Sequence, residues 1–412
     1  MAKAPRAIPD APARANRALS FDQRMATALF ALLAVLPAAS HAAAGGYLLL
    51  LGERAMIFAI AALSLELLIG AGGLVSFGHA AFVGVGAYAA GIAASHGHGD
   101  VMTALPAALA ASALLALATG AIAVRTQGVY FIMITLAFGQ MAYFIATSLA
   151  PYGGDDGLSW PTRSLVLGTR ILKNETVFFY LCLALLIASY LGISRLVASR
   201  FGRVLRGLMD NATRMEAIGF APYRYRLTAY VIAGAIGGLA GFLLGNQAEF
   251  VSPAYMHWQR SGELIMMVLL GGTGTRYGPM FGALAFLVLE ETLSRVTVNW
   301  KIMLGPLLVA TVLYAKGGIA GAIDAWRQRP QPPVAAVARR RPTRVLAAAG
   351  RGLLASAGRL AGRWRSRFRF AGPRTVAAAW GAVKIACGCR LARLAPLAGR
   401  GTRIAGARRW WR

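Results

Sequence analysis

A polar, arginine-rich island interrupts an otherwise apolar chain at residues 196–226, LVASRFGRVLRGLMDNATRMEAIGFAPYRYR. A polar loop of this length, placed between apolar segments, is expected to lie in water and to contact a partner. Its apolar positions recur at helical spacing, namely Leu205, Leu208, Met209, Ala212 and Met215. Gly219 fits a helix C-cap, and Pro222 blocks continuation. The island is therefore predicted to form a short amphipathic helix at the membrane surface.

The rest of the chain has the composition of a polytopic membrane protein. Of its 412 residues 57% are hydrophobic and 14% are charged, and the mean hydropathy is +0.57. Apolar runs of about the length of a membrane span lie at residues 26–44, 47–69, 76–95, 103–124, 129–150, 177–194, 227–245, 261–275, 279–294 and 300–315. We predict an all-α protein with about ten transmembrane helices, some of them discontinuous. Residues 25–321 form the expected transmembrane domain.

Basic residues set the expected orientation, because Lys and Arg concentrate in cytoplasmic loops. Residues 1–24 are net basic, Arg125 follows four runs, and the island follows six. All three fall on one side by parity, which predicts that the N- and C-termini are cytoplasmic. A cleaved signal peptide is the alternative reading of the start, since Leu29–Leu36 is followed by the small residues Ser40 and Ala42.

The C-terminal tail, residues 322–412, is a separate compositional unit. From Ala325 to Arg412 it holds 21 lysines and arginines and no acid, so that most of the net charge of +28 lies there. We expect it to be disordered or to contact anionic membrane lipids. It contains no recognisable nucleic-acid reading element, so no nucleic-acid partner is predicted. Out-of-frame translation of GC-rich DNA would also produce this composition. Three cysteines give no disulfide framework and no metal site.

A glycine-rich segment joins the second and third apolar runs, residues 67–82, LLIGAGGLVSFGHAAF. Glycine permits unusual backbone and close helix approach, so a broken helix lining a cavity is one reading. Close helix packing is the other. The candidate path residues are Glu66, Ser76, Gly78, His79, Gln140 and Glu263. Polar groups at membrane depth are costly and seldom retained without use. If the helix breaks at these glycines, the Glu66 carboxylate and the His79 imidazole are expected to face a common polar cavity. His79 equally suits a structural hydrogen bond.

The glycine-rich segment resembles a motif of the permeases of branched-chain amino acid ABC importers of the LivM/LivH type, which include urea-importing relatives. Further matching segments follow in order, at residues 135–139, 153–158, 201–206 with 216–219, 252–253 and 267–279. Together they span residues 47–321, and the LivM type is the closer match. Departures from the family pattern occur at Glu66, Gln140, Ala212 and residues 315–319, and they concern the substrate rather than the architecture.

The resemblance implies a multi-pass subunit of the bacterial inner membrane. It also implies that the island is the coupling element, which docks on a cytoplasmic ATPase. The implied docking and loop-fixing residues are Arg203, Arg206, Leu208, Met209, Ala212, Arg214, Met215, Glu216 and Gly219. The implied partners are a homologous permease subunit, two cytoplasmic ATPase subunits and a periplasmic substrate-binding protein. The chain has no G-x-x-x-x-G-K-[ST] phosphate loop, so ATP hydrolysis is assigned to separate subunits.

No catalytic residue, cofactor or metal is predicted for the chain itself. Two other functions stay open on the sequence. One is a urea or short-amide importer of the same class. The other is an ion-coupled secondary transporter, which would need ion ligands in the spans and no docking loop. An intramembrane enzyme is disfavoured, because neither G-x-S-x-G nor H-E-x-x-H occurs.

Overall fold

The computed structural model describes residues 21–42, 46–160, 163–166, 168–296, 299, 302–306, 309 and 317–327. Its α-helices are α1 (Phe21–Ala42), α2 (Gly46–Glu66), α3 (His79–Ser95), α4 (Val101–Ala123), α5 (Val129–Ser148), α6 (Glu175–Ala198), α7 (Arg200–Asp210), α8 (Ala212–Ala217), α9 (Pro222–Ala248), α10 (Trp258–Gly271), α11 (Gly278–Val296) and α13 (Gly318–Arg327). Short elements complete it: η1 (Leu67–Ala71), η2 (Ala150–Tyr152), η3 (Ile171–Lys173), η4 (Pro253–Met256), and the antiparallel pair β1 (Leu158–Ser159) and β2 (Phe250–Val251).

The all-α prediction is confirmed for the described residues, apart from the two-residue β1–β2 pairing. Among these residues, five helices have the length and apolarity to cross a membrane, namely Gly46–Ala71, Val101–Ala123, Val129–Ser148, Glu175–Ala198 and Pro222–Ala248. α1, α3, α10 and α11 match four further predicted runs. The tenth run, residues 300–315, lies mostly outside the described part, as does nearly all of the C-terminal tail.

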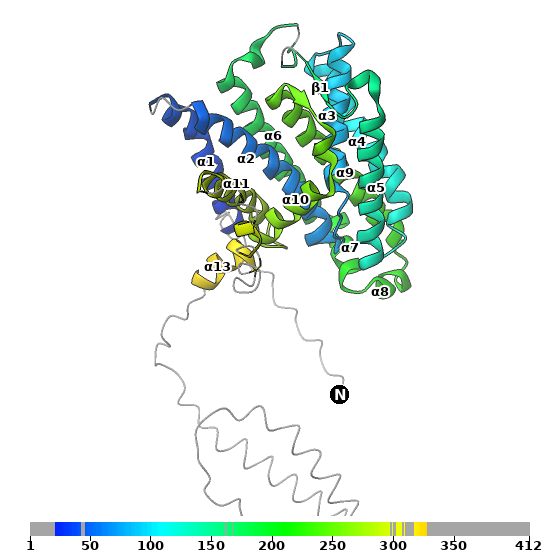
Figure 1. Ribbon diagram of the computed structural model, residues 1–412. Coiled ribbons are helices and arrows are strands. Elements are labelled where there is room, and N and C mark those ends of the chain that lie inside the picture. The colour runs from blue at the N-terminus through cyan, green and yellow to red at the C-terminus, as the bar shows by residue number, and fades with distance from the viewer. Residues whose placement is uncertain are drawn as a thin grey trace, which may run out of the picture. The chain divides into compact units, whose positions relative to one another are not determined.

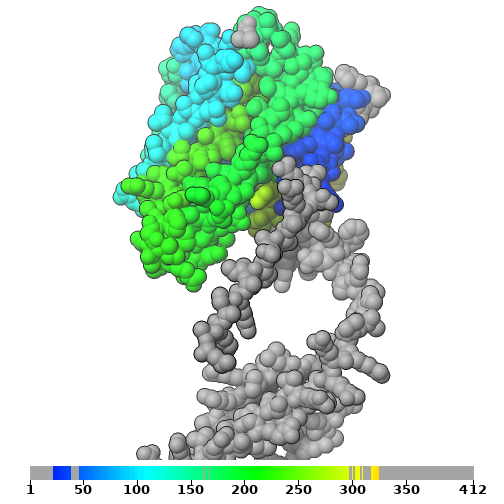
Figure 2. Space-filling model, turned by 180° about the vertical axis from the view of Figure 1, so that it is seen from behind, coloured from blue at the N-terminus to red at the C-terminus, as the bar shows by residue number. Residues whose placement is uncertain are grey.

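Helices α2 and α9 form the centre of the bundle. α9 packs against α2, α3 and α4, and α2 also packs against α6, α10 and α11 (Figure 1). Seen from behind, the green surface of α6 borders the blue surface of α1 (Figure 2). α4 and α5 instead expose large apolar side chains, including Leu114, Tyr130 and Phe144. This distribution suits central helices held by packing and peripheral helices in contact with lipid.

The α3–α9 contact depends on glycine, because the two backbones touch. A Cβ atom built at Gly86 would lie 2.6 Å from the Cα atom of Gly238, and it would overlap the Gly238 carbonyl oxygen. Small residues allow membrane helices to approach this closely, and the resulting van der Waals contact drives their association. Next to this contact, the Phe82 ring of α3 packs edge-on against Tyr230 of α9, with ring centroids 5.4 Å apart.

α2 ends in a π-helical turn, η1, immediately before the chain leaves the helix. Gly73 follows in the left-handed region, with φ +65°. Its N–H donates to the Ile69 carbonyl oxygen at 3.1 Å, and the Leu74 N–H donates to that of Leu68 at 2.9 Å. Single π-turns in helices are frequent at functional sites. This span is therefore discontinuous, as predicted, and the break lies at the glycines on which the prediction was based.

Candidate functional site

The arginine-rich island forms a platform, residues 199–219, at the end of the bundle opposite β1 (Figure 1). Ser199 caps α7, since its side chain accepts from the Gly202 N–H. Two arginines of α7 turn back to the C-terminus of α6. Arg203 donates to the Ala198 carbonyl oxygen at 3.1 Å, and Arg206 donates to that of Val197 at 2.7 Å. These bonds satisfy carbonyl groups that a helix end leaves free, and they fix the α6–α7 angle.

The platform is two helices rather than the single one predicted. Asn211 is extended, with φ −160° and ψ 98°, and its side chain accepts from the Arg214 N–H at 2.9 Å to begin α8. Asn favours N-caps because its side chain competes with the helical backbone, which explains the break. The predicted C-cap at Gly219 is confirmed, with φ +99° and a bond from its N–H to the Glu216 carbonyl oxygen at 2.9 Å.

The two faces of α7 have different surroundings. Leu205 and Leu208 are buried in the permease, and buried Arg226 of α9 donates to the Leu208 carbonyl oxygen at 3.4 Å. Leu208 was predicted to be a docking anchor, but its burial within the chain leaves it no surface for a partner. Met209 is 45% exposed. The other predicted docking residues are exposed, namely Arg203, Arg206, Arg214, Glu216 and Gly219, or half-buried, namely Ala212 and Met215.

Met209 also links the platform to the break in α2. A Cβ atom built at Gly73 would lie 2.8 Å from Cγ of Met209, so this side chain rests on the turn that follows η1. α7 contacts η1 along this edge. A displacement of the platform would therefore act directly on the discontinuous end of α2. The sequence pattern did not predict this contact between Met209 and Gly73.

A cavity of about 220 Å³ lies beside the platform and holds Glu66. Its lining includes Arg206 of α7 and the loop residues Gly274 and Arg276. Glu66 is 8% exposed, and its Oε1 atom accepts from the Gly274 N–H at 2.6 Å. The carboxylate thus ties the end of α2 to the glycine-rich loop between α10 and α11. Glu66 directly precedes the motif segment 67–82, and Gly274 lies in the segment 267–279.

His79 does not share that cavity, which corrects the expectation that Glu66 and His79 face a common space. The fully buried His79 ring contacts Ser64 of α2, with Nε2 2.6 Å from the Ser64 hydroxyl oxygen. Its edge packs against Phe82, with centroids 5.5 Å apart. The geometry is that of the alternative reading, a histidine joining two helices by a buried hydrogen bond.

The remaining predicted path residues lie near the start of α3, on α5 and on α10, where Glu263 accepts from Arg260 at 2.6 Å. Ser76 is fully buried, and the Phe77 N–H donates to the Thr135 hydroxyl at 3.2 Å. Gly78 packs on α5, where a Cβ atom built at Gly139 would lie 3.2 Å from the Gly78 Cα atom. Gln140 is half-buried on α5. Both predicted readings of the glycine segment thus apply, since it breaks a helix at Gly73 and packs closely at Gly78.

A larger cavity, about 400 Å³, opens between α2, α3, η4, α9 and α10. Sequence reasoning missed it. Its polar lining consists of Arg54, Gln247, Tyr255 and Arg260, and its apolar lining includes Phe58 and Leu264. Arg54 is a charged residue within the apolar run 47–69, and this is the signal in the sequence that could have indicated a polar site. Arg54 and Arg260 line the same cavity because α2 and α10, which are far apart in the chain, pack together.

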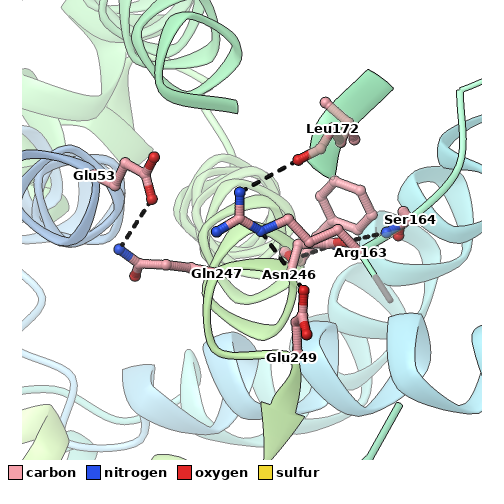
Figure 3. A network of polar contacts seen from close by, with 8 residues as sticks. Glu53, Arg163, Ser164, Leu172, Asn246, Gln247 and Glu249 are labelled. Atoms are coloured by element: carbon pink, nitrogen blue, oxygen red, sulfur yellow. Dashed lines mark hydrogen bonds and ion pairs between the residues drawn. The ribbon is translucent and has the colours of Figure 1, made fainter. Parts of the chain in front are cut away.

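A polar network supports one wall of this cavity (Figure 3). Gln247 reaches Glu53 of α2, with its Nε2 atom 3.5 Å from Oε2, and donates to the Leu50 carbonyl oxygen at 3.0 Å. Next to it, Asn246 accepts from the Ser164 N–H at 2.7 Å. Arg163 donates to the Leu172 carbonyl oxygen at 3.3 Å and lies 4.0 Å from Glu249. The loop after α5 is thereby tied to the C-terminus of α9.

Comparison with known proteins matches the family described as branched-chain amino acid transport system / permease component over residues 47–312. The chain is 28% identical over 288 residues to the high-affinity branched-chain amino acid transport system permease protein LivM of Salmonella typhimurium, covering 64% of this chain and 68% of that protein. Identity to LivM of Escherichia coli is 27% with the same coverage.

The autoinducer 2 import system permease protein LsrC of an Enterobacter species is 28% identical over 260 residues, covering 58% of this chain and 70% of that protein. No solved structure matches the chain at comparable significance. The matched family region contains nearly all of α2, all of α3 to α11, the 400 Å³ cavity and the whole platform.

Proposed function

The chain belongs to the family of permease components of branched-chain amino acid transport systems, and from this premise we propose that it is the membrane subunit of an ATP-driven importer of branched-chain amino acids. The observation that carries the mechanism is the contact between Met209 and the turn at Gly73. It connects an exposed, charged platform to the end of a discontinuous span. Docking of a separate ATPase on the platform would transmit its closure to α2 through this contact.

The platform residues have different roles in this proposal. Arg203 and Arg206 hold α7 against α6, while Leu205 and Leu208 anchor it from within. Met209 and the half-buried Ala212 and Met215 supply apolar contact for the ATPase. Exposed Arg214 and Glu216 orient it, and Gly219 ends α8. An amphipathic helix docked in a groove uses this division between apolar anchors and flanking charges.

The remaining subunits follow from the same proposal. A homologous permease pairs with this chain, two ATPase subunits bind at the platform end in the cytoplasm, and a periplasmic binding protein delivers the substrate at the β1–β2 end. The basic loops at the platform end agree with a cytoplasmic location.

Uptake by the complete reconstituted complex tests the function. We expect proteoliposomes containing this chain, its permease partner, the ATPase and the binding protein to accumulate leucine only when ATP is present on the ATPase side. A proton or sodium gradient without ATP is expected to give no accumulation. Leucine uptake driven by the gradient alone would identify a secondary transporter. ATP-driven uptake of urea without leucine would identify the urea importer.

Glu66 is expected to act as a structural acceptor, so Glu66→Gln should retain ATP-driven leucine uptake within about a factor of two, because the amide keeps an oxygen at the same reach for the Gly274 N–H. Glu66→Leu removes that oxygen and strands a buried donor, which costs about 1–3 kcal/mol of stability. Thermal unfolding in detergent and uptake measure the two effects. A selective loss of uptake in Glu66→Gln, with unchanged thermal stability, would place the Glu66 charge in the path instead.

A further inference from the structure

We infer that the 400 Å³ cavity between α2, α3, α9 and α10 is a binding site for a zwitterionic amino acid, in which Arg54 and Arg260 receive the carboxylate. The inference rests on the proposed transport function and names residues that contact the substrate. Arg54 and Arg260 take the substrate-binding role that the sequence suggested for Glu66 and His79, which instead form hydrogen bonds within the chain.

The cavity is built for a ligand with one apolar part. Large apolar side chains from four helices line it, namely Leu50, Phe58, Val83, Leu244 and Leu264. A cavity of about 400 Å³ is of the size typical for small-molecule sites. Apolar walls with a few convergent polar groups are the usual composition of such sites. An aliphatic side chain would be desolvated against these walls, whereas a small polar molecule such as urea would gain nothing from them.

The polar lining of the cavity includes two arginines. Arg54 and Arg260 both line it, together with Tyr255. Each arginine forms an ion pair, since Arg54 lies 3.8 Å from Glu290 and Arg260 donates to Glu263 at 2.6 Å. A guanidinium group has five N–H donors, so each arginine retains donors for a second carboxylate. Their side chains are 40% and 34% exposed, which leaves them accessible to a ligand.

The start of α3 adds to the positive potential. Ala80, in the first turn of α3, lines the cavity, and its N–H donates to the Ser261 hydroxyl at 3.0 Å. The first turn of α3, where the positive end of the helix dipole lies, therefore borders the cavity, and an anionic group is favoured there.

The ammonium group has a partner in the adjoining cavity. Arg260 also lines a second space of about 300 Å³, together with Glu263, His257 and Tyr143. A carboxylate beside a guanidinium group is complementary to the two charged ends of a zwitterion. This pair of charges favours amino acids over other ligands. A simple carboxylate has no ammonium group to bind Glu263, and a neutral amide has no charge to bind either residue.

Arg54→Gln and Arg260→Gln, in the reconstituted complex, test the assignment. We expect each change to lower the number of leucine molecules imported per ATP hydrolysed by about tenfold, as for the loss of one hydrogen bond to a charged group. ATP hydrolysis stimulated by the loaded binding protein should persist, because the platform is untouched. Arg260→Lys should restore part of the ratio, since it keeps the charge and loses the forked geometry.

Two variants serve as controls. Arg295→Gln removes an exposed arginine that also pairs with an acid, Glu291 at 3.1 Å, but lies outside the cavity lining, so its ratio should equal that of the wild type. Glu290→Gln breaks the ion pair of Arg54 while keeping the arginine. The inference is overturned if Arg54→Gln and Arg260→Gln both import as much leucine per ATP hydrolysed as the wild type. It is also overturned if Glu290→Gln lowers this ratio as much as Arg54→Gln does. Failure of the proposed function is distinct, because the wild-type complex would then show no ATP-coupled leucine uptake.

Discussion

Replacing Met209 with Asp is expected to reduce ATP-driven leucine uptake to background and to abolish co-purification of the ATPase, while the permease still inserts into the membrane. Met209 is 45% exposed and rests on the turn at Gly73, so the change affects both the proposed docking surface and the contact with α2. An unpaired carboxylate desolvated in an apolar interface costs several kcal/mol. This free-energy cost exceeds the binding free energy that the neighbouring contacts of a short helix would contribute. Ala212→Asp, at the start of α8, is expected to weaken docking in the same way.

Ile171→Asp is the matched control. It introduces the same charge at a 51% exposed apolar residue, in η3 on the loop between α5 and α6, away from the platform. This variant should co-purify with the ATPase as the wild type does. Unchanged co-purification in Met209→Asp would contradict the proposed docking role of the platform.

Gly86→Leu is expected to prevent stable folding of the permease. The Cβ atom alone would meet the Gly238 backbone on α9, and neither backbone segment has room to move without separating α3 from α9. Overpacking of this kind costs about 3 kcal/mol or more. In a membrane protein it also removes the close contact by which the helices associate. Size-exclusion chromatography in mild detergent should show loss of the monodisperse peak.

Gly192→Leu provides the comparison, because a Cβ atom at this position of α6 meets no heavy atom within 4 Å. Replacing a helical glycine at an open site is expected to be neutral or stabilising by about 0.5–1 kcal/mol. If both leucine variants elute and unfold alike, the α3–α9 contact does not determine stability.

Hydropathy and charge were enough to predict the helical segments, because burying an apolar run in lipid is a local property of about twenty residues. The break at Gly73 and the polar platform were also predictable. Glycine permits an irregular backbone, and arginines concentrate in cytoplasmic loops. The prediction of a single helix in the platform was wrong. Asn211 carried a cap signal, but the apolar spacing ran through it.

The candidate sites depended more on tertiary structure. Sequence placed Glu66 and His79 thirteen residues apart in one motif, and proximity along the chain suggested a shared cavity. The structure instead pairs Glu66 with Gly274 and His79 with Ser64. A buried polar group bonds whichever partner the packing of helices brings within about 3 Å, and that choice is not encoded by spacing in the chain.

The sequence by itself thus determined that this protein is an apolar, helical membrane subunit with an arginine-rich surface loop, since those features follow from local transfer free energies. Only the tertiary structure decided that Met209 rests on the Gly73 turn and that Arg54 and Arg260, more than two hundred residues apart, line one cavity. The physical reason is that helix–helix packing in a membrane is directed by small residues and shape rather than by hydrophobicity, which is nearly uniform along every span.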